Sequence, residues 1–135
     1  MRAADAFFDS SVLCYLLTGP DDRAEVVESL LLQGGHLNVQ VLNEIAAVAL
    51  RKRALTLEEV REFLGGIREF CHTHAMTVDT HERGLDIAQR YGFSLYDSTM
   101  VAAALEAGCR RLYSEDLQNG QIIEKRLRVL NPFEK

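Results

Sequence analysis

Four acidic residues stand at separate places in the chain where a folded domain could bring them together: Asp9, Glu44, Asp97 and Asp116. Asp9 directly follows an apolar run, and Asp116 comes two residues after another. Glu44 lies among apolar neighbours, where an unpaired carboxylate is costly to bury. Gathered carboxylates are typical of sites that use a divalent metal ion to polarise water. Metal-assisted hydrolysis is therefore the chemistry that these residues indicate.

Short apolar runs alternate with helical patterns from one end of the chain to the other. The runs that favour strands are 6–8, 36–39, 76–78, 111–114 and 127–130. Apolar periodicity and capping residues predict helices over 12–17, 23–33, 41–53, 56–74, 80–91 and 95–107. The alternation predicts an α/β fold, a three-layer α/β/α domain with a mostly parallel central sheet of four to five short strands. We expect one domain over residues 1–135.

A parallel sheet would place the four acids at one edge. Asp9 and Asp116 follow strands, so both are expected at the carboxyl ends of the sheet. Asp97 and Glu44 lie in the opening turns of helices that begin at that same edge. Each acid also has a purely structural explanation, as a helix cap, a partner of a helix dipole or a solvated side chain. Their convergence from four segments favours a chemical role.

Clustered carboxylates need a cation. Two of them at 4 Å repel by roughly 4 kcal/mol at an effective dielectric constant near 20. A divalent ion removes this cost, and oxygen ligands without histidine or cysteine favour Mg²⁺ or Mn²⁺ over Zn²⁺. Sites of this kind cleave phosphodiesters.

Four segments carry a resemblance to a known family. They are Phe7-Phe8-Asp9-Ser10-Ser11-Val12-Leu13, Leu42-Asn43-Glu44, and the two later stretches Tyr96–Ala104 and Leu112–Leu117. Together they resemble the PIN-domain family, and within it the VapC-like toxin ribonucleases of toxin–antitoxin modules. The resemblance implies a metal-dependent endoribonuclease that hydrolyses RNA, forms a homodimer and is silenced by a cognate antitoxin protein. A catalytically silent PIN fold that only binds nucleic acid or a partner is the alternative.

The resemblance also implies roles for individual residues. Asp9, Glu44, Asp97 and Asp116 would be the catalytic acids that bind one or two Mg²⁺ or Mn²⁺ ions. The supporting residues would be Ser10, Ser11, Ser114 and Glu115. Asp116 is expected to face the metal, with its neighbour Glu115 as the other candidate.

The segment Cys71-His72-Thr73-His74 invites a zinc interpretation, which we set aside because no second ligand pair has the spacing of a zinc module. Neither a phosphate-binding loop nor a dinucleotide-binding glycine motif is present.

The charge balance limits how RNA can be bound. A net charge of −5 argues against a protein that coats nucleic acid with positive charge. Lys125, Arg126 and Arg128 are candidate RNA contacts, whereas residues 51–53 are expected at the far end of the Glu44 helix. No apolar run is long enough to cross a membrane, and the odd set of three cysteines suggests reduced thiols, so we expect a cytoplasmic protein.

Overall fold

Strands and helices alternate in the computed structural model, which describes residues 5–19 and 21–134. The strands are β1 (Ala6–Phe8), β2 (Gly35–Asn38), β3 (Cys71–His74), β4 (Arg111–Tyr113), β5 (Ile122–Ile123) and β6 (Leu127–Leu130). The helices are α1 (Ser10–Leu13), the 3-10 helix η1 (Cys14–Leu17), α2 (Asp22–Leu32), α3 (Val39–Lys52), α4 (Leu57–Arg68), α5 (Val78–Tyr91) and α6 (Leu95–Glu106). The predicted α/β class is confirmed.

The strands form one sheet in the order β3-β2-β1-β4-β6-β5. Strand β1 lies between β2 and β4, and every pairing is parallel except that of β5 with β6. The two-residue β5 gives the sheet six strands instead of the four to five expected. Because β1, β2 and β4 run in the same direction, their carboxyl ends share one edge, as the sequence argument requires.

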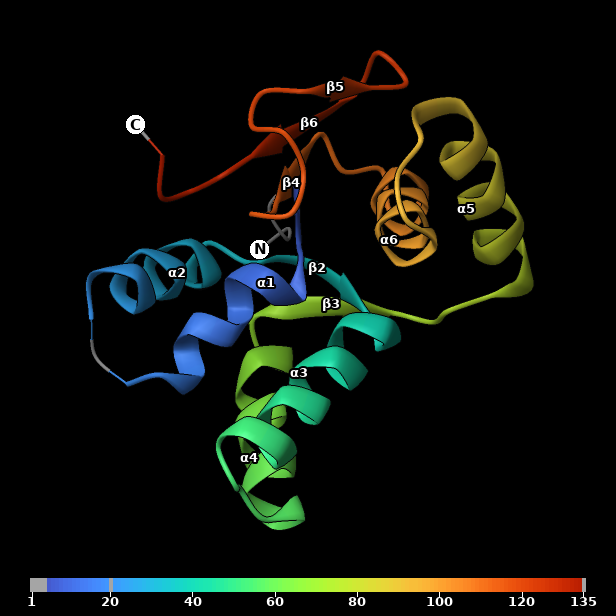
Figure 1. Ribbon diagram of the computed structural model, residues 1–135. Coiled ribbons are helices and arrows are strands. Elements are labelled where there is room, and N and C mark those ends of the chain that lie inside the picture. Colours follow the sequence, from blue (N-terminus) through green and yellow to red (C-terminus); the bar gives the residue numbers. More distant parts are fainter. Residues whose placement is uncertain (1–4, 20, 135) are drawn as a thin grey trace.

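Helices flank the sheet on both sides. Figure 1 shows α5 and α6 packed side by side on one side, α1 and α2 on the other, and α3 with α4 extending together beyond β3. Helices α1 and α3 begin where β1 and β2 end. Helix α6 precedes β4 and therefore also begins at the carboxyl edge. The helix starts thus bring their first-turn side chains to one place.

One predicted strand and one predicted helix are wrong. Helix α4 has the capping box expected at Thr56 but ends at Arg68, not near residue 74. The third strand is Cys71–His74, whereas residues 76–78 contain the cap of α5 at Thr77 and the first residue of that helix. The strand forms because it pairs in parallel with β2, from Gly35–Cys71 to Asn38–His74. Local patterns do not report a partner that is so distant in the chain.

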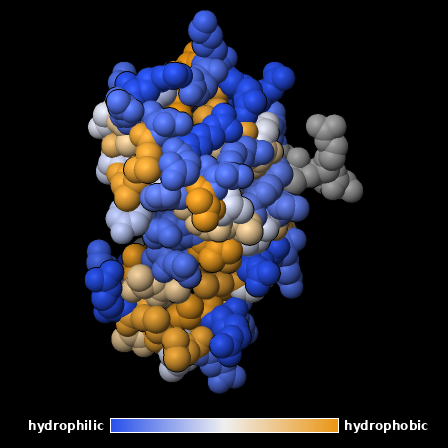
Figure 2. All heavy atoms as spheres, turned by 90° about the vertical axis from the view of Figure 1, so that its right-hand side faces the viewer, coloured by the Kyte–Doolittle hydropathy of each residue, from blue (hydrophilic) through white to orange (hydrophobic). Residues whose placement is uncertain are grey.

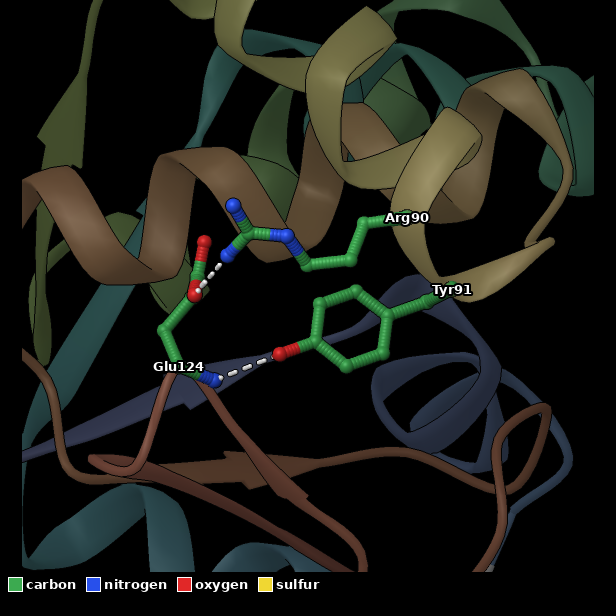
Figure 3. A network of polar contacts seen from close by, with 3 residues as sticks. All are labelled: Arg90, Tyr91 and Glu124. Carbon is green, nitrogen blue, oxygen red and sulfur yellow. Dashed lines mark hydrogen bonds and ion pairs between the residues drawn. The ribbon is translucent and has the colours of Figure 1, made fainter.

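The β5–β6 hairpin is fixed to the end of α5 (Figure 3). Its turn contains Glu124 and Lys125 with positive φ angles of 53° and 58°. The Glu124 N–H donates to the Tyr91 hydroxyl at 2.9 Å, and the Glu124 carboxylate forms an ion pair with Arg90 at 2.6 Å. These contacts hold the hairpin turn at the amino-terminal end of β6.

Buried apolar side chains line both faces of the sheet, and β1 is at their centre with Phe7 and Phe8 fully buried. Figure 2 shows apolar side chains gathered on the surface at the end of the molecule where α3 and α4 lie, and Leu57 there is 70% exposed. The three cysteines are free thiols. Among the described residues, no helix is both long and apolar enough to span a bilayer.

Candidate active site

Asp9 is the fixed point of the site. It follows β1, its side chain is buried, and its N–H donates to the Tyr113 carbonyl of the neighbouring strand at 3.0 Å. The Ser11 and Ser114 hydroxyls both donate to Asp9 Oδ2, at 2.7 and 2.8 Å. Hydrogen bonds to a charged acceptor are the stronger kind, so these two hydroxyls hold the carboxylate in one orientation.

Ser10 connects Asp9 with Glu44. Its hydroxyl lies 3.1 Å from Glu44 Oε1 and 3.4 Å from Asp9 Oδ1. Glu44 is half-buried on α3, which begins just after β2 because the Asn38 side chain accepts from the Val41 N–H. Burial raises the pKa of the Glu44 carboxyl, and the Asp9 charge raises it further. The hydrogen bond from the Ser10 hydroxyl acts in the opposite direction and lowers the pKa.

Asp97 and Asp116 complete the cluster. Asp97 is in the first turn of α6, where the Ser94 hydroxyl accepts from its N–H at 3.2 Å. Burial, and to a smaller extent the Asp9 charge, raise the pKa of Asp97. Partial burial followed by the charges of Asp9 and Asp97 raises the pKa of Asp116 to about 6. The four predicted acids therefore lie close enough to perturb one another.

The supporting residues divide into two groups. Ser10, Ser11 and Ser114 touch the acids, and Ser114 also accepts from the Asp116 N–H at 3.0 Å. The Glu115 side chain instead lies beside the Tyr15 phenol, whose pKa its carboxylate raises. The Glu115 N–H donates to Ser11 at 3.2 Å. Its backbone thus supports the site while its carboxylate faces Tyr15.

The predicted RNA contacts lie elsewhere. Lys125, Arg126 and Arg128 are at the amino-terminal end of β6, the opposite edge of the sheet from the acids. The Arg126 guanidinium donates to the Leu105 carbonyl at the end of α6. The structure does not bring these residues to the acidic cluster.

Two other basic residues come closer than the sequence suggested. Lys52 and Arg53 line a pocket of about 190 Å³ together with Ser11, Cys14 and Tyr15. Burial and the nearby charges of Asp9 and Glu44 raise the pKa of Cys14 to about 11, so this pocket adjoins the acids. The tight 3-10 helix η1 turns the chain back along α3, which brings these segments together. The basic run at 51–53 is visible in the sequence, but its position near the acids depends on that turn.

The donor chemistry of the cluster fits a hard divalent ion. All four side chains offer oxygen, which favours Mg²⁺ or Mn²⁺. Across the described residues, no three acidic, histidine or cysteine side chains already surround a common ion position. Carboxylates that raise one another's pKa repel, and a cation between them would remove that repulsion.

Known proteins place the chain in a family. The sequence profile of the PIN domain matches residues 6–122, which include all four acids. The chain belongs to the PIN domain family. No curated protein matches this PIN domain chain in sequence. The family expected from the sequence motifs is therefore confirmed.

Solved structures share the fold of this PIN domain. VapC20 of Mycobacterium tuberculosis, a toxin that cleaves the sarcin-ricin loop, is 19% identical with a TM-score of 0.69, over 90% of this chain and 98% of its own. A toxin–antitoxin complex from Klebsiella pneumoniae gives 19% identity and a TM-score of 0.72, over 96% and 99%. VapBC2 from Rickettsia felis, bound to a promoter DNA fragment, is 12% identical with a TM-score of 0.66. The match covers 92% of this chain and 96% of that one.

Proposed function

We propose that this PIN domain is an Mg²⁺- or Mn²⁺-dependent endoribonuclease and the toxin of a toxin–antitoxin pair. The observation that carries the proposal is the convergence of Asp9, Glu44, Asp97 and Asp116 at one sheet edge, with serine hydroxyls holding the most buried of them. Similarity of fold to VapC toxins supports the choice of RNA as substrate. We also expect one or two ions in the site.

The acids would have different tasks because they differ in burial. Asp9 is buried and doubly hydrogen-bonded, so it would orient whatever binds beside it. Asp97 is half-buried and Asp116 is exposed, so these two would meet the water and the phosphodiester. A bound divalent ion would supply positive charge to the phosphate oxygens and polarise the attacking water.

RNA would reach the acids along the pocket of Lys52 and Arg53. No ion pair involves either side chain in the described part of the protein. Both are therefore available for phosphate oxygens, which bind lysine and arginine well. Lys125, Arg126 and Arg128 are unsuited to this task because they lie at the opposite edge.

This chain also has a surface that could bind a protein partner. Leu42, Leu57, Val60 and Leu64 line an apolar groove between α3 and α4, with Arg61 and Arg68 beside them. Exposed apolar patches rimmed by polar residues mark interaction sites. We propose that the chain binds an antitoxin, forms a homodimer and works in the cytoplasm.

The test compares two acids that occupy the same kind of position. Asp97 and Asp79 each lie in the first turn of a long helix, but only Asp97 is in the cluster. Asp97→Asn and Asp79→Asn are assayed on a panel of RNAs with Mg²⁺, with Mn²⁺ and with a chelator. We expect Asp79→Asn to cleave like the wild type and Asp97→Asn to lose at least about 100-fold in rate, as expected for a group that stabilises the transition state.

Cleavage by folded Asp97→Asn at the wild-type rate, or cleavage that persists in the chelator, would refute the proposal. If the wild type cleaves none of the RNAs and its melting temperature is unchanged by millimolar Mg²⁺, the chain is a silent binding module instead. A ligand that binds only the folded protein must raise its stability.

A further inference from the structure

Three of the four histidines lie together at the edge of the sheet. His36 is on β2, and His72 and His74 are on the edge strand β3. His36 Nδ1 is 2.9 Å from His74 Nε2. The ring centroids are 5.1 Å apart for His36 and His74, 4.3 Å for His72 and His74, and 5.9 Å for His36 and His72.

Strand geometry explains the cluster. His72 and His74 are two residues apart, so their side chains point to the same face of the sheet. The register pairs His36 directly with His72 in the parallel neighbour, which adds a third imidazole to that face. The pairing of two regular strands is therefore enough to bring the three imidazoles together, and no loop is involved.

The spacing is close to that of a three-histidine zinc site. With Zn–N bonds of about 2.0–2.1 Å in tetrahedral geometry, ligand nitrogens lie roughly 3.3 Å apart and ring centroids about 5 Å apart. His36 Nδ1 and His74 Nε2 are 2.9 Å apart and share a hydrogen bond, which a metal ion would replace once the nitrogen that carries the proton gives it up. In the described residues the three rings do not yet surround one ion position, so zinc binding requires them to rotate toward a common point.

The surroundings favour the metal-binding form of the rings. Partial burial and the neighbouring imidazoles lower the pKa values of His36 and His74, so both are neutral at pH 7 and keep a free nitrogen lone pair. His74 and Glu106 line the same pocket of about 270 Å³, where the Glu106 carboxylate accepts from Thr80 at 2.6 Å. Of the three histidines, His74 lines this pocket, so water in it reaches the His74 side of the cluster.

We propose that His36, His72 and His74 bind one Zn²⁺ ion, which joins β2 to the edge strand β3. Imidazole nitrogens suit zinc, whereas the oxygen donors of the acidic cluster suit Mg²⁺ or Mn²⁺. The two donor sets thus select different metals on one sheet.

The experiment measures Zn²⁺ binding by calorimetry with Mg²⁺ in large excess. His81 on α5 is exposed and outside the cluster, so His81→Ala is the matched control. We expect one Zn²⁺ per chain for the wild type, His81→Ala and Asp97→Asn. His36→Ala and His74→Ala should bind at least about 100-fold more weakly, because even residues behind the metal ligands are worth 10- to 100-fold. His72→Ala, at an exposed position, serves if a more buried variant does not fold.

Co²⁺ provides an independent readout. Nitrogen ligands in tetrahedral geometry give it an intense visible absorption, which octahedral oxygen ligands do not. The band should appear with wild type and His81→Ala and be absent with the variants of the cluster. Equal Zn²⁺ affinity in His36→Ala, His72→Ala and the wild type overturns the proposal. So does a loss of Zn²⁺ binding in Asp97→Asn, which would place the ion among the acids.

Discussion

Ser114 and Ser98 are both fully buried serines, but their hydroxyls are in opposite situations. The Ser114 hydroxyl donates to Asp9 Oδ2 at 2.8 Å and accepts from the Asp116 N–H at 3.0 Å. The Ser98 hydroxyl has no hydrogen-bond partner anywhere in the described residues. Alanine at these two positions should therefore change the free energy of unfolding with opposite signs.

The size of each change follows from the contacts. Ser114→Ala removes a hydrogen bond to a charged acceptor, worth about 1.5–3 kcal/mol. The Asp116 N–H adds little because water can replace the lost acceptor at this exposed residue. Ser98→Ala removes a desolvated hydroxyl, a gain of about 1 kcal/mol. It also adds roughly 0.5 kcal/mol of helix propensity inside α6. The two variants should differ by about 3–4.5 kcal/mol.

Urea unfolding followed by circular dichroism, in a chelator and with equal m-values, measures both changes. Asp9→Asn tests the cause, because a neutral acceptor is weaker and Ser114→Ala should then cost less than it does beside the carboxylate. The reasoning fails if both alanine variants shift stability in the same direction. It also fails if Ser114→Ala costs less than about 0.5 kcal/mol.

Three further outcomes are expected. The carboxyl of Asp116 has a pKa of 3.8 in its ordinary state and about 6 here, so the native protein binds more protons between these values. Stability of the metal-free wild type relative to Asp116→Asn should therefore fall as pH rises from about 4 to 6, and saturating Mg²⁺ should remove the fall, as denaturant titrations will show. Lys52→Ala and Arg53→Ala should each raise KM for RNA and reduce the salt dependence of binding by about 0.7 in log–log slope, measured by anisotropy. Gly84→Ala places a Cβ 2.6 Å from a Thr99 methyl carbon and should cost about 1–3 kcal/mol. At Gly65 an added Cβ meets nothing within 4 Å, so Gly65→Ala should stabilise the protein by about 0.5–1 kcal/mol. Thermal unfolding measures the stability of both glycine variants.

The place of the acids could be predicted because it depends on chain direction alone. Asp9 follows a strand, and Glu44 lies in the opening turns of a helix that follows another. Parallel pairing therefore brings both to one edge whatever the details of packing. The capping boundary at Thr56 is equally local, and it is where the sequence placed it.

Features that depend on which segments become neighbours were not accessible. The Cys71–His74 strand exists because β2 offers it a partner, and the same pairing brings His36 to His72. From the sequence, the zinc interpretation was set aside because no second ligand pair has the required spacing, whereas the register of two distant strands brings a third histidine, His36, beside His72. The pocket of Lys52 likewise needs the 3-10 turn that carries Cys14 and Tyr15 back along α3.

Burial divides the acidic cluster into a rigid part and an adaptable part. Asp9 follows two fully buried phenylalanines on the central strand, and the Tyr113 carbonyl ties its backbone to β4. Asp97 and Asp116 are held through their backbone N–H groups by Ser94 and Ser114, which leaves their carboxylates freer than that of Asp9. The charges of Asp9 and Asp97 raise the pKa of Asp116, so a cation bound beside Asp9 would relieve this repulsion while Asp9 stays in place. We therefore expect substitutions of Ser11 and Ser114 to disturb the geometry of the site more than substitutions around Asp97 do.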